Sequence, residues 1–496
     1  MDYLLGIDFG GSASKATLLD TKGKVVGISS VEYPTAYPQP GWVEQNPTDW
    51  YEVLVANVQK LFEETEVSAA SIVAVCLDAP THTAVLLDEQ NRILRPAIYW
   101  TDRRSVAQVK YLQENYDELI VATALHKVDT IWTLPQLLWV KENEPDIWER
   151  VARVVFAKDY IRYMLTGEFF TDFIEAQGSM LFDCHTKTWS RSLCDLVELD
   201  IPKLPPVISP VKKAGAITRI AAEQTGLCAG TPVICGSTDT ALEVFAAGAV
   251  NLGQMTVKLA TAGRICVITD RPWPDVNLVN YSHVVPGLWY PGTATKSCAA
   301  SYRWYRDTFG EDYKALDEAA SSVPSGSQGL LFHPYLAGEL TPYADPLLAA
   351  SFTGVTLAHT KAHFNRAVLE GVGFSLLDSL VTLDKLGIAR ENQAQIIGGG
   401  AKSGLWRQII ADILGLTLCQ PENSDSSLGA AMLAGVAMGI FTDFDDAVRN
   451  CCRTCSFIEP DAQRHEDYGG IFTIYKQIQA ALAPIYHQCS RLQGNE

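Results

Sequence analysis

Residues 3–19 read YLLGIDFGGSASKATLL, which is two apolar runs joined by a turn of small residues. The first run, Tyr3–Phe9, carries an acid near its end, and the second run covers Lys15–Leu19. A turn at residues 20–23 then leads into a third apolar run, Lys24–Ile28. Short apolar runs separated by tight turns predict a meander at the start of a sheet.

The same pattern returns near the middle of the chain. A strand is predicted at Thr231–Cys235, a helix at Ala241–Ala247, and two strands, Met255–Leu259 and Arg264–Ile268, flank another turn of small residues. Each copy of the strand, turn and strand opens a region of domain length. We therefore predict two α/β domains, at residues 1–248 and 249–496.

Helix ends and apolar periodicity predict further elements. Asn46-Pro47 starts a helix, because asparagine caps well and proline suits the first helical position. The other predicted elements are a buried strand at Ile72–Leu77, a helix from Thr360 to Leu386, a strand at Gln395–Ile397 and a helix from Leu405.

Length, charge and composition narrow the class of protein. A chain of 496 residues is too long for one core, which agrees with two domains. The net charge of −18 opposes binding to nucleic acid. The apolar stretch Leu428–Phe441 is too short to span a bilayer and predicts a buried helix. Without a targeting peptide or a cysteine framework, we expect a cytoplasmic protein with no membrane partner.

The turn at residues 10–14 has the composition of a phosphate-binding loop. Gly10 and Gly11 let the backbone approach a charged ligand, and Ser12, Ser14 and Lys15 add donors and charge. Asp8, at the end of the strand, is placed to hold a metal ion through water. Taken alone, the same residues also fit an ordinary hairpin turn with an exposed lysine.

Two other loops of small residues follow strands. One contains Thr261 and Gly263, and the other contains Gly399, Gly400 and Ala401 between a strand and a helix. Glycines in the second loop allow a purine or ribose to lie against the backbone. Three such loops on two successive sheets predict a nucleotide site more strongly than any one of them.

Asp239 is the candidate general base. It follows a buried strand and precedes a helix, a position that faces ligands in α/β proteins. A carboxylate there accepts the proton of an attacking hydroxyl. On local evidence alone, a helix N-cap is the favoured interpretation of this aspartate.

Together these residues resemble the FGGY carbohydrate kinases, and within them the xylulokinase-like branch, over essentially the whole chain. The motifs that carry the resemblance are Ile7–Ser12, Gly41–Pro47, Tyr99–Arg104, Ser351–Val355 with His363–Gly371, and Ile397–Ser403 with Trp406 and Asp412.

The resemblance implies two actin-like ATPase domains, of the ribonuclease H type, flanking a cleft that holds ATP and Mg²⁺. It implies Asp239 as the catalytic base that activates a hydroxyl of a small sugar such as xylulose. The sugar-binding residues that it implies are Thr81, His82, Trp100, Asp102, Asp239 and Thr240.

The sequence also departs from the family pattern. The Met-His-Gly of xylulokinases reads Thr81-His82-Thr83, and the second phosphate loop begins Ala260-Thr261. Other substrates therefore stay open, namely ribulose, glycerol, gluconate or another polyol, as does an actin-like ATPase without sugar kinase activity. The oligomeric state is open as well, with a homodimer as the commonest arrangement.

Overall fold

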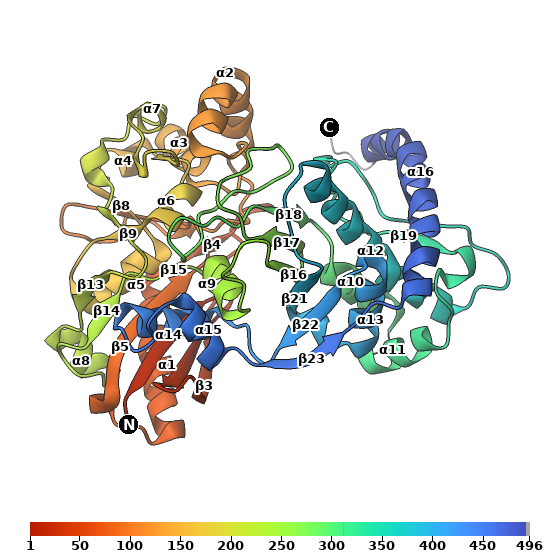
Figure 1. Cartoon of the computed structure of the whole chain (residues 1–496). Coiled ribbons are helices and arrows are strands. Elements are labelled where there is room, and N and C mark those ends of the chain that lie inside the picture. Colours follow the sequence, from red (N-terminus) through yellow and green to blue (C-terminus); the bar gives the residue numbers. More distant parts are fainter. Residues whose placement is uncertain (311, 493–496) are drawn as a thin grey trace. The chain divides into compact units, whose positions relative to one another are not determined.

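The computed structural model describes residues 1–310 and 312–492, which form two units (Figure 1). The first unit consists of Met1–Val250, Asn280–Trp289 and Asn423–Arg453, and the second consists of Asn251–Val279, Tyr290–Glu422 and Thr454–Glu496. The first change of unit lies two residues beyond the predicted boundary. Because two later segments return to the first unit, the units differ from the predicted contiguous halves, 1–248 and 249–496.

The first unit is built on a mixed sheet. Its strands lie in the order β13-β14-β5-β1-β2-β3, in which β1, β5 and β14 are parallel and the others antiparallel to their neighbours. The strands are β1 (Tyr3–Phe9), β2 (Ala13–Asp20), β3 (Val25–Glu32), β5 (Ile72–Ala79), β13 (Lys213–Ala216) and β14 (Pro232–Ile234). The predicted meander is therefore confirmed as β1, β2 and β3.

The two faces of this sheet carry different helices. Leu5, Ile7 and Phe9 of β1 share one apolar core with Trp50 and Leu54 of helix α1 (Pro47–Thr65). Because side chains alternate along a strand, the other residues of β1 face the opposite side. The predicted helix start is confirmed, since Asn46 caps α1 by accepting from the Thr48 amide.

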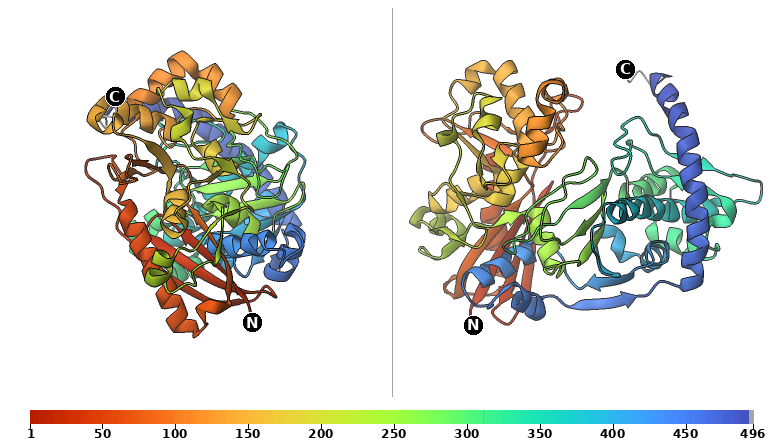
Figure 2. Two further views of the ribbon diagram at one scale, coloured as in Figure 1. Left: turned by 90° about the vertical axis from the view of Figure 1, so that its left-hand side faces the viewer. Right: turned by 45° about the horizontal axis from the view of Figure 1, so that its top comes forward.

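The opposite face is covered by a helix from far along the chain, α14 (Ser426–Ala437). A Cβ atom on Gly6 of β1 would lie 2.0 Å from the Ser427 carbonyl oxygen, so only glycine admits α14 at this distance. Residues Ser426–Gly435 are all buried, which confirms the predicted buried helix. In Figure 2 (right), the blue helices of residues 423–453 lie beside the red strands. This packing explains why residues 423–453 belong to the first unit.

The second unit repeats the topology of the first. Its sheet has the order β18-β17-β16-β21-β22-β23, with β16, β21 and β22 parallel and the others antiparallel to their neighbours. The strands are β16 (Met255–Leu259), β17 (Gly263–Val267), β18 (Gly292–Thr295), β21 (Gln393–Ile397), β22 (Thr417–Pro421) and β23 (Thr454–Ile458). One strand order in two units is the arrangement of actin-like, ribonuclease H-like domains, which confirms the predicted fold class.

Helices and short strands complete both units. The first unit also contains α2 (Val106–Ala124), α3 (Thr133–Asn143), α4 (Pro145–Trp148), α5 (Ala157–Thr166), α6 (Phe173–Gly178), α7 (Arg191–Asp195), α8 (Arg219–Thr225), α9 (Asp239–Ala246), α15 (Phe444–Cys451), β4 (Glu44–Gln45), β6 (Ala84–Leu87), β7 (Ala97–Ile98), β8 (Arg153–Phe156), β9 (Thr171–Asp172), β10 (Phe182–Asp183), β11 (Thr188–Trp189), β12 (Val207–Ile208) and β15 (Ser237–Thr238). The second unit also contains α10 (Ala299–Phe309), α11 (Tyr313–Ser321), α12 (Lys361–Lys385), α13 (Gly404–Leu414), α16 (Ala462–Leu492), β19 (Leu331–His333) and β20 (Ser351–Thr353).

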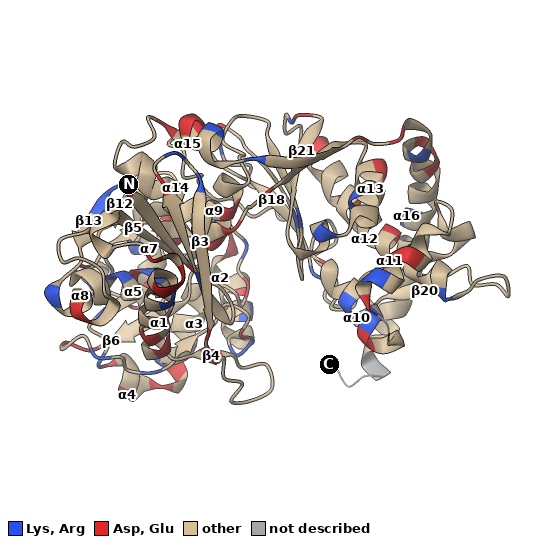
Figure 3. Cartoon of the chain, turned by 90° about the horizontal axis from the view of Figure 1, so that it is seen from below, with Lys and Arg blue, Asp and Glu red and all other residues tan. Residues whose placement is uncertain are grey.

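Charged residues of both signs occur along the chain. Acidic and basic residues are interspersed along the ribbon in Figure 3, and acids outnumber bases by 57 to 39 in the whole sequence. Within residues 1–310 and 312–492, none of the helices combines the length and the apolar character needed to cross a bilayer.

Candidate active site

Two carboxylates lie opposite each other where β1 and β5 end. Asp8 and Asp78 are register partners in the parallel pair, and both point to the face of the sheet that α14 covers. Asp78 is fully buried. Within the part of the chain that the structure describes, no N–H or hydroxyl group donates to either Asp78 oxygen or to Asp8 Oδ1, and the two carboxyl groups hydrogen-bond with each other.

Burial and mutual repulsion disfavour the charged forms of this pair. Burial, together with the charges of Asp425 and Asp239, raises the pKa of Asp8 to about 7, although a hydrogen bond with Asp78 partly opposes the increase. Burial also raises the pKa of Asp78 well above its usual range, and the neighbouring Asp8 adds to the increase. The pair therefore holds a proton more readily than two separate, solvated carboxyl groups would.

The backbone turns sharply between β14 and α9 to place Asp239. Gly236 has a φ of 76°, and a Cβ atom there would lie 2.0 Å from the Leu77 carbonyl oxygen. The turn brings β15 beside β5, with Ser237 opposite Asp78. Asp239 follows directly as the first residue of α9, and its charge raises the pKa of both Asp8 and Asp78. The carboxylates of Asp8, Asp78 and Asp239 thus form one cluster.

The interpretation of Asp239 as the helix N-cap is wrong. Thr238 caps α9, because its side chain accepts from the Ala241 amide. Asp239 Oδ1 instead accepts from the backbone amide of Thr240 at 2.6 Å. Its carboxylate is partly exposed, so that a general base at this position has access to a ligand.

Helix α14 begins beside the cluster. Its N-cap is Asp425, which also forms an ion pair with Lys15, and Ser427 Oγ lies 2.6 Å from Thr17 Oγ1. Lys15, which was predicted to add charge to a phosphate loop, therefore has an ion-pair partner within the protein. The start of α14 and the start of α9 both direct backbone N–H groups to this region, as helix N-termini do at anion sites.

The residues of the first small-residue loop divide into two groups. Gly11 and Ser12 are exposed, and Gly10 is partly exposed, with its amide donating to the Ala13 carbonyl. Ser14 is fully buried, and its Oγ accepts from Asn57 Nδ2 at 3.1 Å. The structure thus leaves the backbone of residues 10–12 accessible, whereas the hydroxyl of Ser14 belongs to the packing of α1 against the sheet.

His82 is held in an uncommon backbone conformation by α6 and α3. Its φ is 59°, its amide donates to Glu175 Oε1 at 2.6 Å, and its carbonyl accepts from Thr133 Oγ1 at 2.6 Å. The imidazole is buried, with its centroid 4.8 Å from that of Trp132. Its Nδ1 has no hydrogen-bond partner within residues 1–310 and 312–492. Thr81, beside it, is partly exposed.

We expect His82 to make the protein less stable in acid. Burial lowers the pKa of His82 to about 3, so the folded state binds fewer protons than the unfolded state between pH 3 and 6.5. The stabilisation present above pH 6.5 is therefore lost progressively as the pH falls, by about 2 kcal/mol at pH 5. The His82→Asn variant, which tolerates the positive φ, should lose less stability between pH 7.5 and pH 5 than the wild type in thermal unfolding. An equal loss in both proteins would contradict this.

The segment with Trp100 and Asp102 provides one exposed and one buried residue. Trp100 is 39% exposed, which excludes a core position and leaves its face available to a ligand. Asp102 is buried and already accepts four hydrogen bonds, from the Val43 amide and from the backbone, Nε and Nη2 of Arg104. In this structure the carboxylate of Asp102 is thus bound within the protein, and its role in sugar binding stays a prediction.

Arg104 connects the two tryptophan-containing motifs. Its guanidinium lies 3.9 Å from the Trp42 ring centroid and donates to Glu44 Oε1 at 2.8 Å. Both residues belong to the Gly41–Pro47 motif, and Arg104 belongs to the Tyr99–Arg104 motif. The two motifs thus form one buried ionic and aromatic contact.

The Asp102→Asn variant should separate a structural role from sugar binding. Because the amide cannot accept from the guanidinium and the Val43 amide as the carboxylate does, we expect a loss of about 1.5–3 kcal/mol in stability. The Michaelis constant for the sugar should change by less than about threefold, on the order of 0.7 kcal/mol. Thermal unfolding and steady-state kinetics measure the two effects. A large rise in the Michaelis constant at unchanged stability would restore Asp102 to the sugar site.

In the second unit, the two small-residue loops also contain accessible and buried residues. Thr261 is exposed, but Gly263 is buried, and its amide donates to Thr295 Oγ1 at 3.1 Å. Gly399 is exposed with open space around its Cα, whereas a Cβ atom on Gly400 would lie 2.8 Å from the Trp406 ring. Ala401 is buried. Thr261 and Gly399 are therefore the accessible members of the predicted nucleotide set.

Sequence reasoning missed several residues around the carboxylates. Asp78 lies one position beyond the predicted strand Ile72–Leu77. The sequence feature that could have identified it is an acid directly after an apolar run. Beneath Asp239 lies a buried ionic network in which Lys158 Nζ is 2.6 Å from Asp159 and 3.2 Å from Asp172. The sequence feature that could have revealed this network is the pair Lys158-Asp159 directly after an apolar run.

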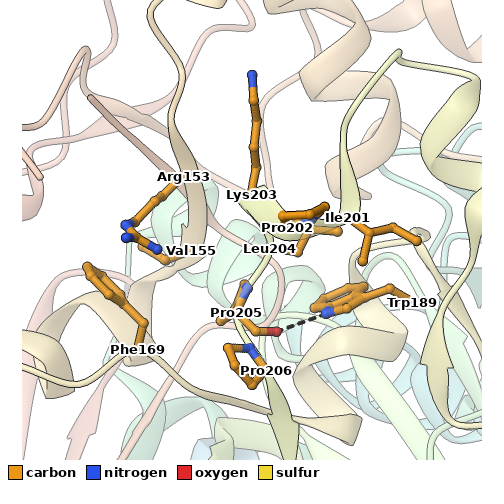
Figure 4. A pocket seen from close by; sticks show the side chains of 10 residues that line it. All are labelled: Arg153, Val155, Phe169, Trp189, Ile201, Pro202, Lys203, Leu204, Pro205 and Pro206. Atoms are coloured by element: carbon orange, nitrogen blue, oxygen red, sulfur yellow. Dashed lines mark hydrogen bonds between the residues drawn. The ribbon is translucent and has the colours of Figure 1, made fainter. Parts of the chain in front are cut away.

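A separate pocket of about 390 Å³ lies elsewhere in the first unit (Figure 4). Its walls include Phe169, Trp189 and the prolines of residues 202–206, with Arg153 and Lys203 among the lining residues. None of the predicted site residues lines it, so it is distinct from the carboxylate cluster.

Two units of one topology, with acids where the first unit's central strands end, define an actin-like phosphotransferase. Residues 3–246 match the N-terminal domain and residues 261–438 the C-terminal domain of the FGGY family of carbohydrate kinases. The chain belongs to this family. Such enzymes transfer a phosphoryl group from ATP to a hydroxyl of a sugar.

Individual relatives are similar over nearly their whole length. The xylulose kinase of Bacillus subtilis (strain 168) is 32% identical, over 96% of this chain and 97% of that protein. The solved structure of xylulose kinase from Rhodospirillum rubrum is 30% identical, with a TM-score of 0.90, over 98% of this chain and all of that one. Gluconate kinase from Lactobacillus acidophilus, 25% identical, has a TM-score of 0.92 over 98% of this chain and 99% of that one.

Proposed function

We propose that this enzyme phosphorylates a ketopentose, with xylulose as the first candidate, and that it uses ATP with Mg²⁺ as the phosphate donor. The names of the relatives at 30–32% identity support the substrate class. The observation that carries the proposal is the partly exposed Asp239 carboxylate beside Asp8 and the fully buried Asp78.

Asp239 is the proposed general base. A hydroxyl of the sugar donates to its carboxylate, and the proton passes to Asp239 as the oxygen attacks the phosphoryl group. The bond between the amide of Thr240 and Asp239 Oδ1 fixes the orientation of the carboxylate. Thr238, as the N-cap, fixes the start of the helix that carries it.

Asp8 is the proposed contact to the metal, through water, and its environment fits a cation. Buried carboxylate oxygens without donors are acceptors of the type that Mg²⁺ prefers. No group of three or more acidic, histidine or cysteine side chains in residues 1–310 and 312–492 is arranged to hold a metal ion alone. This agrees with a cation that keeps water and phosphate ligands. When bound, Mg²⁺ neutralises charge on the transferred phosphoryl group.

The remaining nucleotide contacts are assigned to accessible backbone. In the first unit, we assign Gly10, Gly11 and Ser12 to the phosphates, since their loop is open to ligand. In the second unit, we assign Thr261 to the phosphates and Gly399 to the nucleoside. Gly400 and Ala401 shape the second loop by packing, as does Gly263 in its own loop.

The sugar contacts are assigned to Thr81, His82 and Trp100, with Thr240 beside the base. His82 is neutral at physiological pH because of its burial, so its free Nδ1 accepts a hydrogen bond if Nε2 carries the proton. Thr83 Oγ1 is also buried and without a partner in the part of the chain that the structure describes. A buried polar atom without a partner costs about 1–3 kcal/mol, which favours sugars that supply one.

A coupled ATP assay against ketoses, alditols and aldonates tests the proposal. We expect D-xylulose to give the highest kcat/KM, with phosphorylated sugar formed in equal amount to ADP. Gluconate is the second candidate, supported by the similarity to gluconate kinase. ATP hydrolysis that no sugar accelerates would contradict the sugar kinase proposal. Light scattering on the same preparation tests the expected homodimer.

A further inference from the structure

Asp78 is a buried acid to which the reaction described above assigns no role. It lies on β5, the central parallel partner of β1, and is fully buried. An ionised carboxylate in such a position is costly unless hydrogen bonds or a cation compensate for the loss of water. In residues 1–310 and 312–492, neither of its oxygens has an N–H or hydroxyl donor, and its hydrogen bond is to the carboxyl of Asp8.

The surrounding charges increase the need for a cation at Asp78. Its register partner is Asp8, and the carboxylates of Asp239 and Asp425 lie nearby. The neighbouring Lys15 forms an ion pair with Asp425. On the other side of the turn, Lys158 pairs with Asp159 and Asp172. Both of these lysines are thus bound to other carboxylates.

The positions of Asp8 and Asp78 suit a shared ligand. Side chains of register partners in a parallel pair project on the same side of the sheet. Gly6, two residues before Asp8, and Cys76, two residues before Asp78, are also register partners, so both strands approach this end side by side. Oδ1 of Asp8 and both oxygens of Asp78 are the atoms without donors.

We propose that Asp78 is the second carboxylate of the divalent-cation site, so that Asp8 and Asp78 together receive the cation that accompanies the phosphate donor. The inference rests on the proposed function for the identity of that donor. It assigns Asp78 a role in metal affinity, and it accounts for a fully buried acid without an N–H or hydroxyl donor at the end of a central strand.

Direct titration with Mn²⁺, in the absence of nucleotide and sugar, tests this role on the full chain. Water-proton relaxation reports bound Mn²⁺ without any need for catalysis. We expect the Asp78→Asn variant to bind Mn²⁺ at least about tenfold more weakly than the wild type, the scale of a lost group at a metal site. The Asp8→Asn variant should show a loss of the same order.

Thermal unfolding supplies a second readout. Without metal, Asp78→Asn removes a repelled carboxylate, and we expect its Tm to rise by about 2–4 °C. Mn²⁺ should raise the Tm of the wild type and have a smaller effect on the variant. Asp88→Asn is the matched control, because Asp88 is also buried but accepts from the Gln90 and Arg92 amides. This control should lower the Tm and leave Mn²⁺ affinity unchanged.

The outcomes distinguish the inference from the proposed function. Equal Mn²⁺ affinity in the wild type and Asp78→Asn, or no Mn²⁺ site in the wild type, would overturn the role of Asp78, even if the enzyme phosphorylates xylulose. Weakened Mn²⁺ binding in the variant would support it, even if no sugar in the panel is phosphorylated, in which case the proposed function alone would fail.

Discussion

The Asp239→Asn variant is expected to lose at least about 100-fold in kcat, the lower end of the effect of removing a general base. The amide keeps the size of the side chain and still accepts from Thr240 N, so the fold and the start of α9 should be unchanged. It cannot take the proton of the attacking hydroxyl. Steady-state kinetics with the best sugar measures the effect, and circular dichroism checks the fold.

The matched control is Thr240→Ala, which removes a neighbouring hydroxyl but keeps the carboxylate and the backbone amide that binds it. Its kcat should stay within about tenfold of the wild type, as for one lost hydrogen bond of about 0.5–1.5 kcal/mol. Near-normal turnover of Asp239→Asn would show that Asp239 is not the general base.

The Lys158→Met variant is expected to be destabilised by about 3–5 kcal/mol, the scale for breaking a buried ion pair. Lys158, Asp159 and Asp172 are fully buried, and Lys158 contacts both carboxylates. Burial by itself lowers the pKa of Lys158, but the two carboxylates raise it above its usual range, so the lysine is charged in the folded protein. Methionine fills a similar volume and leaves the negative charge of Asp172 uncompensated.

Thermal or urea unfolding of the full chain measures this loss. The Lys141→Met variant is the control, because Lys141 pairs at 2.8 Å with Glu198, whose side chain is 76% exposed. Such a surface pair contributes about 0–1 kcal/mol. Equal stability of both variants would show that the buried network adds nothing to the stability of the first unit.

The strands and helices that carry the site follow from local sequence signals. Tight turns of glycine, serine and aspartate separate the strands of the meander, and the Asn46-Pro47 start coincides with α1. Asp8 and Asp239 are also local features, because each ends an apolar strand or follows one directly. The phosphate-loop composition and these two acids thus indicate the same end of the sheet, where both acids lie in one cluster.

The direction of side chains and their partners from distant segments could not be predicted from the sequence. Asp102 looks like a free acid in a polar segment, but its partners come from Val43 and Arg104. The hydroxyl of Ser14 is bound by Asn57, which lies on another element. Asp78 became meaningful only with the pairing of β1 and β5. Each case depends on a contact between segments that no spacing along the chain reveals.

The interleaving of the two units bears on the order in which the protein folds during synthesis. Most of the second unit lies between residue 250 and residue 423, yet α14, which covers β1, comes after it. While the ribosome synthesises the second unit, the face of the first sheet that α14 covers stays uncovered. A nascent chain in this state exposes apolar surface that invites aggregation. We expect that a stop anywhere before residue 426 releases a first unit that chaperones retain, whereas the loss of residues from α16 leaves that unit complete.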